Sequence, residues 1–397
     1  MSLNNVKKFA MPLIFLLALL FAILLGGLLP VTVKSFFYTI SLAIKECLIF
    51  ILPLVIFALV YQSFSRLGIN ALKFLFLIIP LICCSNFANT FLSYLVGMSS
   101  IKLGAIAKIQ ATQAELPALL PLFSFKLPSI VSNDIALFSG IVCGIFSKLI
   151  QRSMDEKMVH FFDVFVKYFF KILLPTMPLF IMGTALKLQH DEMLSAICSK
   201  YWAIMLVFVV SAYGYVLLQF LVLSGFRFGR FAFYLKNITP ALITAFGSAS
   251  SAAALPLSLK AAEENLRNKS NAAIIIPSTV NVHLVGDCFF IPMLALGILV
   301  SLGLPLPGCV QYFLFAVYFV LAKFAVAAIP GGGILVMLPI LQAHLNFNGE
   351  MLGLITALYV LFDPIITACN VAGNGAMAII FDRMTKGIQR KRLASNS

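Results

Sequence analysis

Polar side chains stand in apolar sequence near the carboxyl end of the chain, and three of them have helical spacing. Asp363, Thr367 and Asn370 lie four and seven residues apart, which places them on one face of a helix. A carboxylate within an apolar stretch is costly to desolvate and usually faces a cavity or an oppositely charged partner. Asp363 therefore faces either a cavity or an ion-pair partner, for which Lys323 is available. Asn370 has the alternative of an interhelical hydrogen bond.

Two serines lie at a break in another apolar segment. Ser250 and Ser251 fall in the small-residue run 246–256, which ends in proline. A helix N-terminus at this break would offer free N–H groups that suit a carboxylate. The alternative is that small residues only allow helices to pack closely. A serine hydrolase within the membrane is a third interpretation, but no nucleophile-elbow pattern accompanies the serines.

A third group of polar residues lies within the apolar stretch 271–303, which carries Asn281, His283 and Asp287. Because an imidazole titrates near neutral pH, proton coupling through His283, Asp287 or Asp363 is one hypothesis. The alternative for His283 is a structural residue whose ring is hydrogen-bonded within a helix bundle.

The composition places these groups in a membrane protein. Of 397 residues, 61% are hydrophobic and 11% are charged, whereas a soluble domain carries about 25% charged residues. The mean hydropathy is +1.05, and repeated apolar stretches approach the ~20 residues that a spanning helix needs. The net charge of +14 comes from basic residues in short loops and at the carboxyl end. This placement indicates topology signals beside a lipid bilayer, with no nucleic acid partner.

The second half of the chain is interrupted where the first half is not. Segments 240–275 and 310–345 are apolar but contain clusters of Ser, Gly and Pro. Unsatisfied backbone costs several kcal/mol per group in hydrocarbon, so such segments must be buried in protein or line a cavity. We interpret both as re-entrant helical hairpins around a binding site, with two further spans at 271–303 and 351–381. Six ordinary spans are predicted at 9–31, 37–62, 70–97, 129–150, 162–186 and 201–226.

The basic residues favour a multi-pass protein of the cell (inner) membrane with both termini in the cytoplasm. With six crossings before the first hairpin, the cluster from Lys260 to Lys269 and the basic residues from Arg383 to Arg392 fall inside. A full crossing at 240–275 would move the first cluster outside. Two hairpins that meet in mid-membrane favour a secondary transporter over a channel. The sequence contains no P-loop. It therefore supports neither ATP-driven transport nor an enzyme that uses ATP through such a loop.

Four motifs in the second half resemble the dicarboxylate/amino acid:cation symporter family, which includes glutamate/aspartate and neutral amino-acid transporters. Each motif is weak alone, but together they follow the order, spacing and hydropathy of that family, while the first half matches only in layout. The motifs belong to the first hairpin, span seven, the second hairpin and span eight. They are the tip Ala245–Pro256, Asn281-Val-His283, Ile329-Pro-Gly-Gly-Gly333 and Asp363…Thr367…Asn370-Val-Ala-Gly-Asn374.

The resemblance implies an all-α fold of eight transmembrane helices and two re-entrant hairpins, a homotrimer, and a transport domain that moves like an elevator. It divides the chain into six helices at 1–236, a transport core at 237–385 and a basic cytoplasmic tail at 386–397. It also implies an amino-acid substrate and no cofactor beyond a coupling ion, H⁺ or Na⁺. The substrate-binding positions carried over from the family are Ser250, Ser251, Ile329, Gly331, Asp363, Ile366, Thr367 and Asn370.

Ile366 departs from the pattern of family members that carry acidic substrates. In those members an arginine three residues after the aspartate pairs with the side-chain carboxylate of the substrate. Ile366 cannot do so, and the alternative arginine position in the first hairpin is Ala249. Without a cation, a second desolvated carboxylate would be costly. We therefore expect a neutral amino acid as substrate, with glutamate, aspartate or another dicarboxylate as the alternative.

The positions expected to couple transport to a cation depart from the family as well. His283 and Asn374 stand where the family has carboxylates, and Lys323 aligns where the second hairpin of the family binds sodium; the alternative for Lys323 is a snorkelling side chain. Weakened sodium coupling, proton coupling, exchange and uniport all remain open. The coupling candidates are Asn281, His283, Asp287, Lys323 and Asn374, and the oxygen ligands left for a weakened sodium site are Asn281, Asn370 and Asn374.

Overall fold

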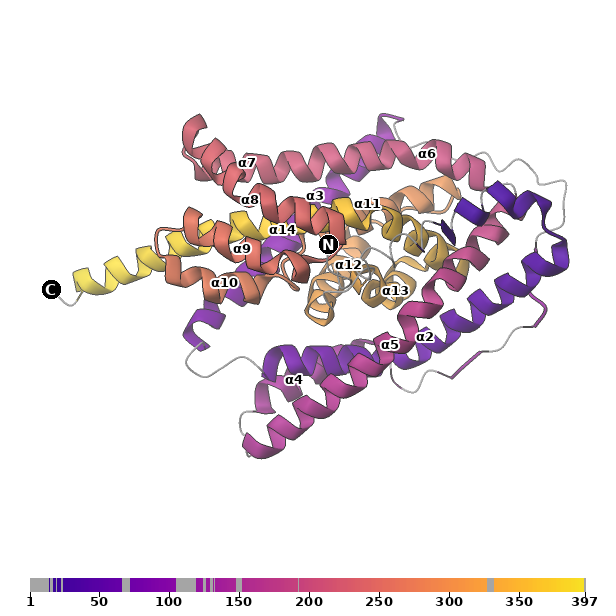
Figure 1. The fold of residues 1–397 in the computed structure, drawn as a ribbon, viewed down its shortest axis with the longest axis horizontal. Coiled ribbons are helices and arrows are strands. Elements are labelled where there is room, and N and C mark those ends of the chain that lie inside the picture. The colour runs from indigo at the N-terminus through magenta and orange to yellow at the C-terminus, as the bar shows by residue number, and fades with distance from the viewer. Residues whose placement is uncertain are drawn as a thin grey trace, which may run out of the picture.

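The computed structural model describes residues 14, 17–18, 20–22, 24–65, 72–104, 119–123, 126–128, 131, 133–147, 152–191, 193–326 and 332–395. Over these residues the chain is helical and contains no strand, which confirms the predicted all-α class for this part. Figure 1 shows an elongated bundle in which the carboxyl-terminal part of α14 (Gly349–Ser395) extends beyond the other helices. The helices long and apolar enough to cross a membrane are Leu77–Lys102, Tyr201–Leu223 and Gly349–Thr385.

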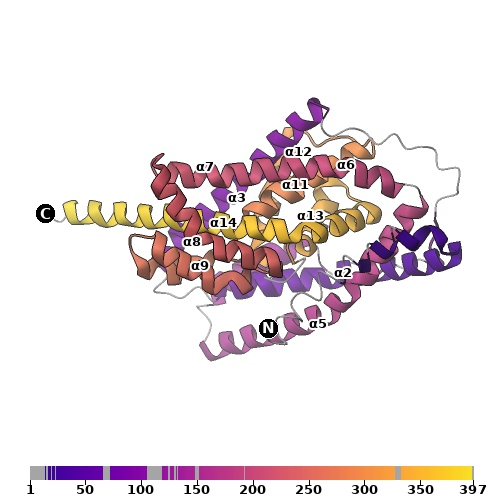
Figure 2. The same ribbon diagram turned by 45° about the horizontal axis from the view of Figure 1, so that its top comes forward.

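The first half forms long helices close to the predicted spans. The expected span 9–31 falls largely outside the described residues, and a short 3-10 helix follows at η1 (Gly26–Leu28). Helix α2 packs along both α4 and α5, and α6 continues through a π-helical turn, η4, into α7 (Figure 2). The elements are α2 (Val31–Ser65), α3 (Leu72–Lys102), α4 (Asn133–Phe146), α5 (Arg152–His190), α6 (Met193–Phe208), η4 (Val209–Tyr213) and α7 (Gly214–Leu223).

Two antiparallel helices, α8 (Phe228–Ser248) and α9 (Ser251–Asn265), pack against each other and form the first hairpin. The predicted bounds of 240–275 are wrong at both ends. The hairpin begins at Phe228 instead of 240. The early turns of α8 carry Arg230 and Lys236, and these charges lower the hydropathy from which the beginning was predicted. The hairpin ends at Asn265, and the position 237 chosen as a domain boundary lies inside α8.

The base of this hairpin is held to α14 by one carboxylate. Asp382 accepts hydrogen bonds from the backbone N–H groups of Arg267 and Asn268 at 3.0 and 3.4 Å, and from the Asn271 side chain at 2.8 Å. These bonds satisfy the backbone of the turn between α9 and the short helix η5 (Lys269–Asn271). The turn therefore belongs to the connection rather than to the hairpin.

The segment predicted as span seven is broken into two helices, α10 (Ala272–Thr279) and α11 (Val285–Ser301). Between them, the Asn86 side chain on α3 donates to the carbonyl oxygen of Val282 at 2.7 Å and accepts from the N–H of Leu284 at 3.3 Å. An amide side chain can serve both a free donor and a free acceptor, which makes an unwound turn tolerable inside a bundle. The sequence predicted one span at 271–303, and the structure shows two helices separated by this turn.

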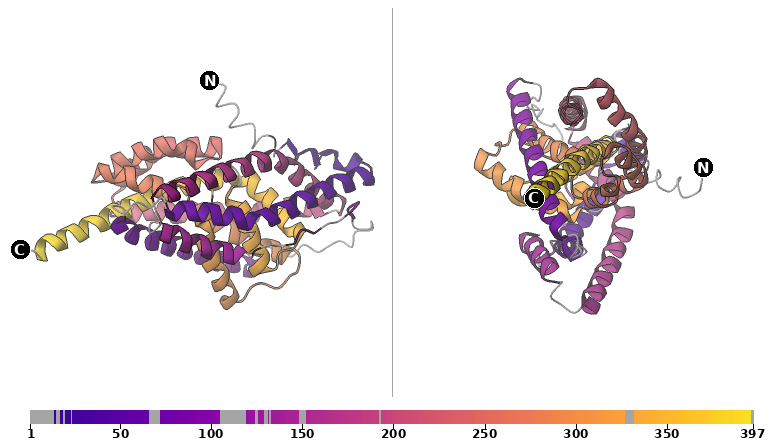
Figure 3. Two further views of the ribbon diagram at one scale, coloured as in Figure 1. Left: turned by 90° about the horizontal axis from the view of Figure 1, so that it is seen from below. Right: turned by 90° about the vertical axis from the view of Figure 1, so that its left-hand side faces the viewer.

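Helix α11 forms the centre of the second half, because every residue from Val285 to Ser301 is buried. It packs between α3 and α14, and α14 also contacts α8, α9 and α13. The end-on view in Figure 3 shows α14 near the middle of the bundle. The second hairpin consists of α12 (Cys309–Ala322), the 3-10 turn η6 (Lys323–Ala325) and α13 (Gly332–Leu345), which packs against α12.

Candidate functional site

A small cavity lies where the first hairpin, the break between α10 and α11, and helix α14 meet. Its volume is ≈ 30 Å³, which is room for about one or two water molecules. Seven of the predicted site residues share its wall, although they are spread over 121 positions of the chain. The lining residues are Ala249, Ser250, Ser251, Val280, Asn281, Leu284, Asp287, Val326, Gly333, Tyr359, Asp363, Thr367 and Asn370.

The tip of the first hairpin brings a helix N-terminus to this cavity. Ala249 adopts a left-handed conformation with φ of 45°, which reverses the chain between α8 and α9. Ser250 is the N-cap of α9, and its hydroxyl oxygen accepts a hydrogen bond from the N–H of Ala253 at 3.3 Å. The predicted helix start beside the serines is therefore present. The positive end of α9 faces the same space as Asp363.

One face of α14 supplies the opposite wall, as the spacing of its polar residues predicts. The Thr367 hydroxyl donates a hydrogen bond to Asp363 Oδ1 at 2.9 Å, and both side chains are buried. Asn370 lies one turn further along the same face. Tyr359, one turn before Asp363, also lines the cavity. Our sequence analysis missed Tyr359, although its spacing of four residues from Asp363 is the signal that could have found it.

Asp287 accepts hydrogen bonds from three side chains of the described part of the site. Its Oδ2 accepts from Lys323 Nζ at 3.0 Å, and its Oδ1 accepts from Tyr359 Oη at 3.1 Å and from Asn370 Nδ2 at 3.0 Å. The backbone N–H of Asp287 donates to Asn370 Oδ1 at 3.3 Å. The interhelical hydrogen bond considered for Asn370 is therefore present.

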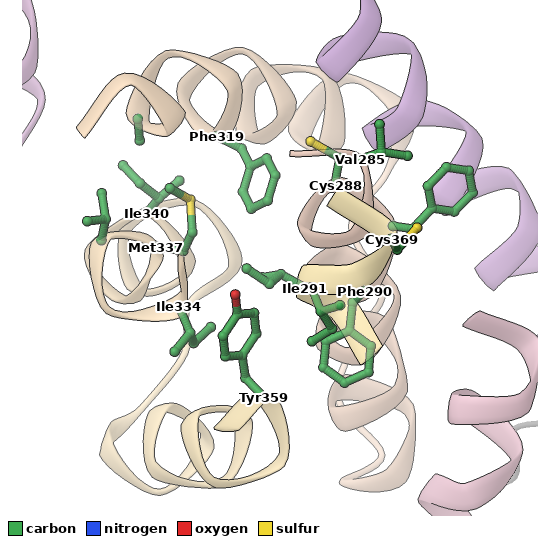
Figure 4. Close-up of a cluster of buried hydrophobic side chains, with 14 of the residues drawn as sticks. Val285, Cys288, Phe290, Ile291, Phe319, Ile334, Met337, Ile340, Tyr359 and Cys369 are labelled. Carbon is green, nitrogen blue, oxygen red and sulfur yellow. The ribbon is translucent and has the colours of Figure 1, made fainter. Parts of the chain in front are cut away.

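Lys323 does not snorkel. Its side chain is 0% exposed, and its ammonium lies 4.3 Å from the centre of the Phe319 ring. Figure 4 shows Phe319, Ile334 and Ile291 around the space into which Tyr359 points its hydroxyl. One alternative from the sequence paired Lys323 with Asp363. The structure instead pairs Lys323 with Asp287. In such apolar surroundings each charge costs several kcal/mol to desolvate, so the hydrogen bonds to Asp287 are needed to hold the pair.

His283 lies outside the cavity wall and bridges two helices. One ring nitrogen, Nε2, is 2.9 Å from Ser85 Oγ on α3, and the other, Nδ1, is 3.0 Å from Asn374 Oδ1 on α14. The ring is 1% exposed. This geometry matches the alternative of a hydrogen-bonded structural histidine. Asn374 Nδ2 and Asn281 Oδ1 are buried without a hydrogen-bond partner among the described residues.

Among the remaining predicted positions that the structure describes, Ile366, His283, Lys323 and Asn374 are not lining residues of the cavity. Ile366 is fully buried in the main hydrophobic core, beside Gly286, where an added Cβ would lie 2.4 Å from the Ile366 carbonyl oxygen. Ile329 and Gly331 lie outside the described residues. The charged residues among those that line the cavity are Asp287 and Asp363, and the lining residues include no arginine or lysine.

Known proteins share this sequence pattern. Residues 11–384 match the Sodium:dicarboxylate symporter family. Human excitatory amino acid transporter 2 is 27% identical over 237 residues, which are 58% of this chain and 41% of the relative. The L-cystine uptake protein TcyP of Bacillus licheniformis is 31% identical over 46% of this chain and 40% of its own length. Human neutral amino acid transporter B(0) is 32% identical over 36% of this chain and 26% of its own length.

The matched segment of the first of these relatives is about two fifths of its length. The family match, in contrast, spans both the long helices of the first half and the hairpins that surround the cavity. It also agrees with the four motifs read from the sequence. Because the match covers nearly the whole chain, this protein belongs to the Sodium:dicarboxylate symporter family, a family of membrane transporters and not of enzymes.

Proposed function

We propose that this protein is a secondary transporter, a symporter, that binds a neutral amino acid between the first hairpin and α14, where the ≈ 30 Å³ cavity must widen to admit it. The supporting observation is the opposition of two charges on the cavity wall. The N-terminus of α9 at Ser250 and Ser251 suits the carboxylate of a zwitterion, and Asp363 suits its ammonium group. A pocket with both signs of charge is complementary to the part that all α-amino acids share.

The preference for a neutral side chain follows from the remaining wall. Asp287 already has Lys323 as its cation, and the other charged lining residue is Asp363. A substrate with a second carboxylate would bring a negative charge into a site without an available cation, at a cost of several kcal/mol. The alternative is a glutamate, aspartate or dicarboxylate symporter, since relatives named for excitatory amino acids and for C4-dicarboxylates also match this chain.

The coupling ion is proposed to be a proton or a weakly bound sodium ion. A sodium site needs oxygen ligands and gains from negative charge. His283 and Asn374 have no carboxylate, and the side-chain oxygen of Asn374 already contacts the His283 ring at 3.0 Å. We further propose a homotrimer with cytoplasmic termini, in which the hairpins with α10, α11 and α14 move as one elevator-like domain. A channel and an intramembrane serine hydrolase are the competing classes.

Thermal stability of the purified protein with each of the twenty amino acids, in Na⁺ and in choline, tests the substrate class. A neutral amino acid should raise the melting temperature, because a ligand that binds only the folded state stabilises it. Uptake and counterflow of that amino acid in proteoliposomes should be saturable. Robust saturable uptake of glutamate or aspartate would contradict the proposed specificity. Single-channel conductance without counterflow would favour the channel, and labelling by a covalent serine probe would favour the hydrolase.

A further inference from the structure

The ion pair of Asp287 and Lys323 joins α11 to the second hairpin and to α14. Asp287 lies in the first turn of α11, and Lys323 lies in η6 at the end of α12. Tyr359 and Asn370 come from α14. Gly333, in the first turn of α13, lies so close that an added Cβ would meet Asp287 Oδ2 at 2.4 Å. One carboxylate therefore holds four elements of the second half together.

The Lys323 ammonium contacts a carboxylate oxygen, which is a ligand that a small cation would also use. Asp287 supplies two carboxylate oxygens, of which Oδ2 contacts Nζ at 3.0 Å, and the hydroxyl of Tyr359 contacts the same carboxylate. Hard cations prefer carboxylate, hydroxyl and carbonyl oxygens. Here the positive charge comes from a side chain of the protein, and the ammonium lies over the ring of Phe319. An ammonium held in this way occupies the volume that a free ion would need.

We propose that the Lys323 ammonium is a tethered substitute for a free cation at Asp287, so that this position takes up no ion from solution. The effect of this lysine on ion stoichiometry rests on the proposed transport function, whereas the binding of a cation at Asp287 can be tested without it. A free cation enters and leaves the site once in each transport cycle. A tethered cation stays with the protein, so this position adds no ion to the stoichiometry and draws no energy from a sodium gradient.

The competing explanation is that the pair only fastens helices. The two explanations differ once the ammonium is removed and the carboxylate is kept. A tethered cation leaves behind an oxygen-lined site with a negative charge, and a free monovalent cation should then bind there. A pair that only fastens helices leaves a buried charge that no free ion relieves.

Thermal unfolding in solutions that differ only in their cation tests this directly and needs no knowledge of the substrate. The full-length variants are K323A, which empties the site, and D287N/K323M, which replaces both charges with neutral side chains of similar size. K187M is the matched control, because Lys187 is likewise a lysine in an ion pair. Its partners are Asp191 at 2.7 Å and Glu350 at 3.3 Å, and the Glu350 side chain is 48% exposed. Each protein is measured in choline, Na⁺, K⁺ and ethylammonium chloride at equal ionic strength.

We expect Na⁺ or ethylammonium to raise the melting temperature of K323A by about 4 °C over choline at saturating concentration. The wild type, the double variant and K187M should show no such rise. Folding of K323A in Na⁺ but not in choline would support the proposal equally. An equal cation response in wild type and K323A overturns it, and so does a K323A that unfolds in every salt while D287N/K323M is folded.

These outcomes are separate from those that decide the transport function. A cation response confined to K323A stands even if no amino acid is transported. Amino-acid transport stands even if K323A binds no cation, since the lysine then only fastens helices.

Discussion

Two buried carboxylates share one cavity wall and have different surroundings. Asp287 is held by Lys323, Tyr359 and Asn370, and its position joins the second hairpin to α11 and α14. Asp363 accepts a hydrogen bond from Thr367 within its own helix and lies opposite the tip of the first hairpin. Asp287 pairs with Lys323, whereas Asp363 lies beside the N-terminus of α9, where we propose that the substrate binds.

The largest effect on stability is expected from D287N. This substitution leaves the ammonium of Lys323 buried without its carboxylate, and breaking one side of a buried pair costs about 3–5 kcal/mol. The free energy of unfolding in detergent should fall by this amount. The double variant D287N/K323M should recover most of the loss, because neither charge is then left unpaired. Equal stability of D287N and the wild type would show that Asp287 does not hold the core.

Asp363 should show the reverse pattern, in which binding changes and the fold does not. D363N keeps the shape of the side chain but removes its charge, and loss of a buried charge partner costs about 2–5 kcal/mol of binding free energy. Substrate affinity, measured by thermal shift or calorimetry, should therefore fall about 30-fold or more. The unfolding free energy of the ligand-free protein should change little. A D363N protein that binds the substrate as tightly as the wild type would remove the distinction between the two acids.

Removal of one donor to Asp287 should give an intermediate effect. Y359F deletes the hydroxyl that lies 3.1 Å from Asp287 Oδ1, and a hydrogen bond to a charged group contributes about 1.5–3 kcal/mol. T367V is its counterpart at Asp363, because it removes the hydroxyl at 2.9 Å. We expect Y359F to lower the unfolding free energy more than T367V, and T367V to lower substrate affinity. A T367V variant that loses more unfolding free energy than Y359F, or a Y359F variant that loses more substrate affinity than T367V, would contradict this division of roles.

The smallest effect is expected at an ion pair near solvent. Lys187 at the end of α5 pairs with Glu350 at the start of α14, and the Glu350 side chain is 48% exposed. Exposed pairs contribute about 0–1 kcal/mol because water and salt screen them. E350Q should therefore change the unfolding free energy by less than D287N does. A loss as large as that of D287N would show that burial does not govern the strength of these pairs.

Much of the fold could be predicted because it follows from the order of polar and apolar residues. The helix start at Ser250 and the shared face of Asp363, Thr367 and Asn370 both depend on neighbours within a few positions. The hairpin bounds were wrong because α8 begins at Phe228 in sequence that carries charge. Hydropathy measures the fit of a segment to lipid, and this helix begins before the apolar part.

The partners in the site could not be predicted in the same way. Ser85 and His283 are 198 residues apart, Lys323 and Asp287 are 36 apart, and Tyr359 and Asp287 are 72 apart. Lys323 had two other interpretations, a partner for Asp363 and a snorkelling side chain. Ile366 was expected at the substrate, but the structure places it in the core beside Gly286. Each outcome depends on how helices pack side by side, which spacing along one helix does not encode.

Hydropathy and helical spacing act over short distances, so the amino-acid sequence alone predicts a polytopic helical membrane protein with broken segments and acids in apolar helices. It also carries the motifs of its family. The pairing of Lys323 with Asp287 rather than with Asp363 comes from the packing of the helices. The reason is physical: a buried charge is neutralised by whichever opposite charge the packed helices bring within about 3–4 Å, however far apart the two residues lie in the chain.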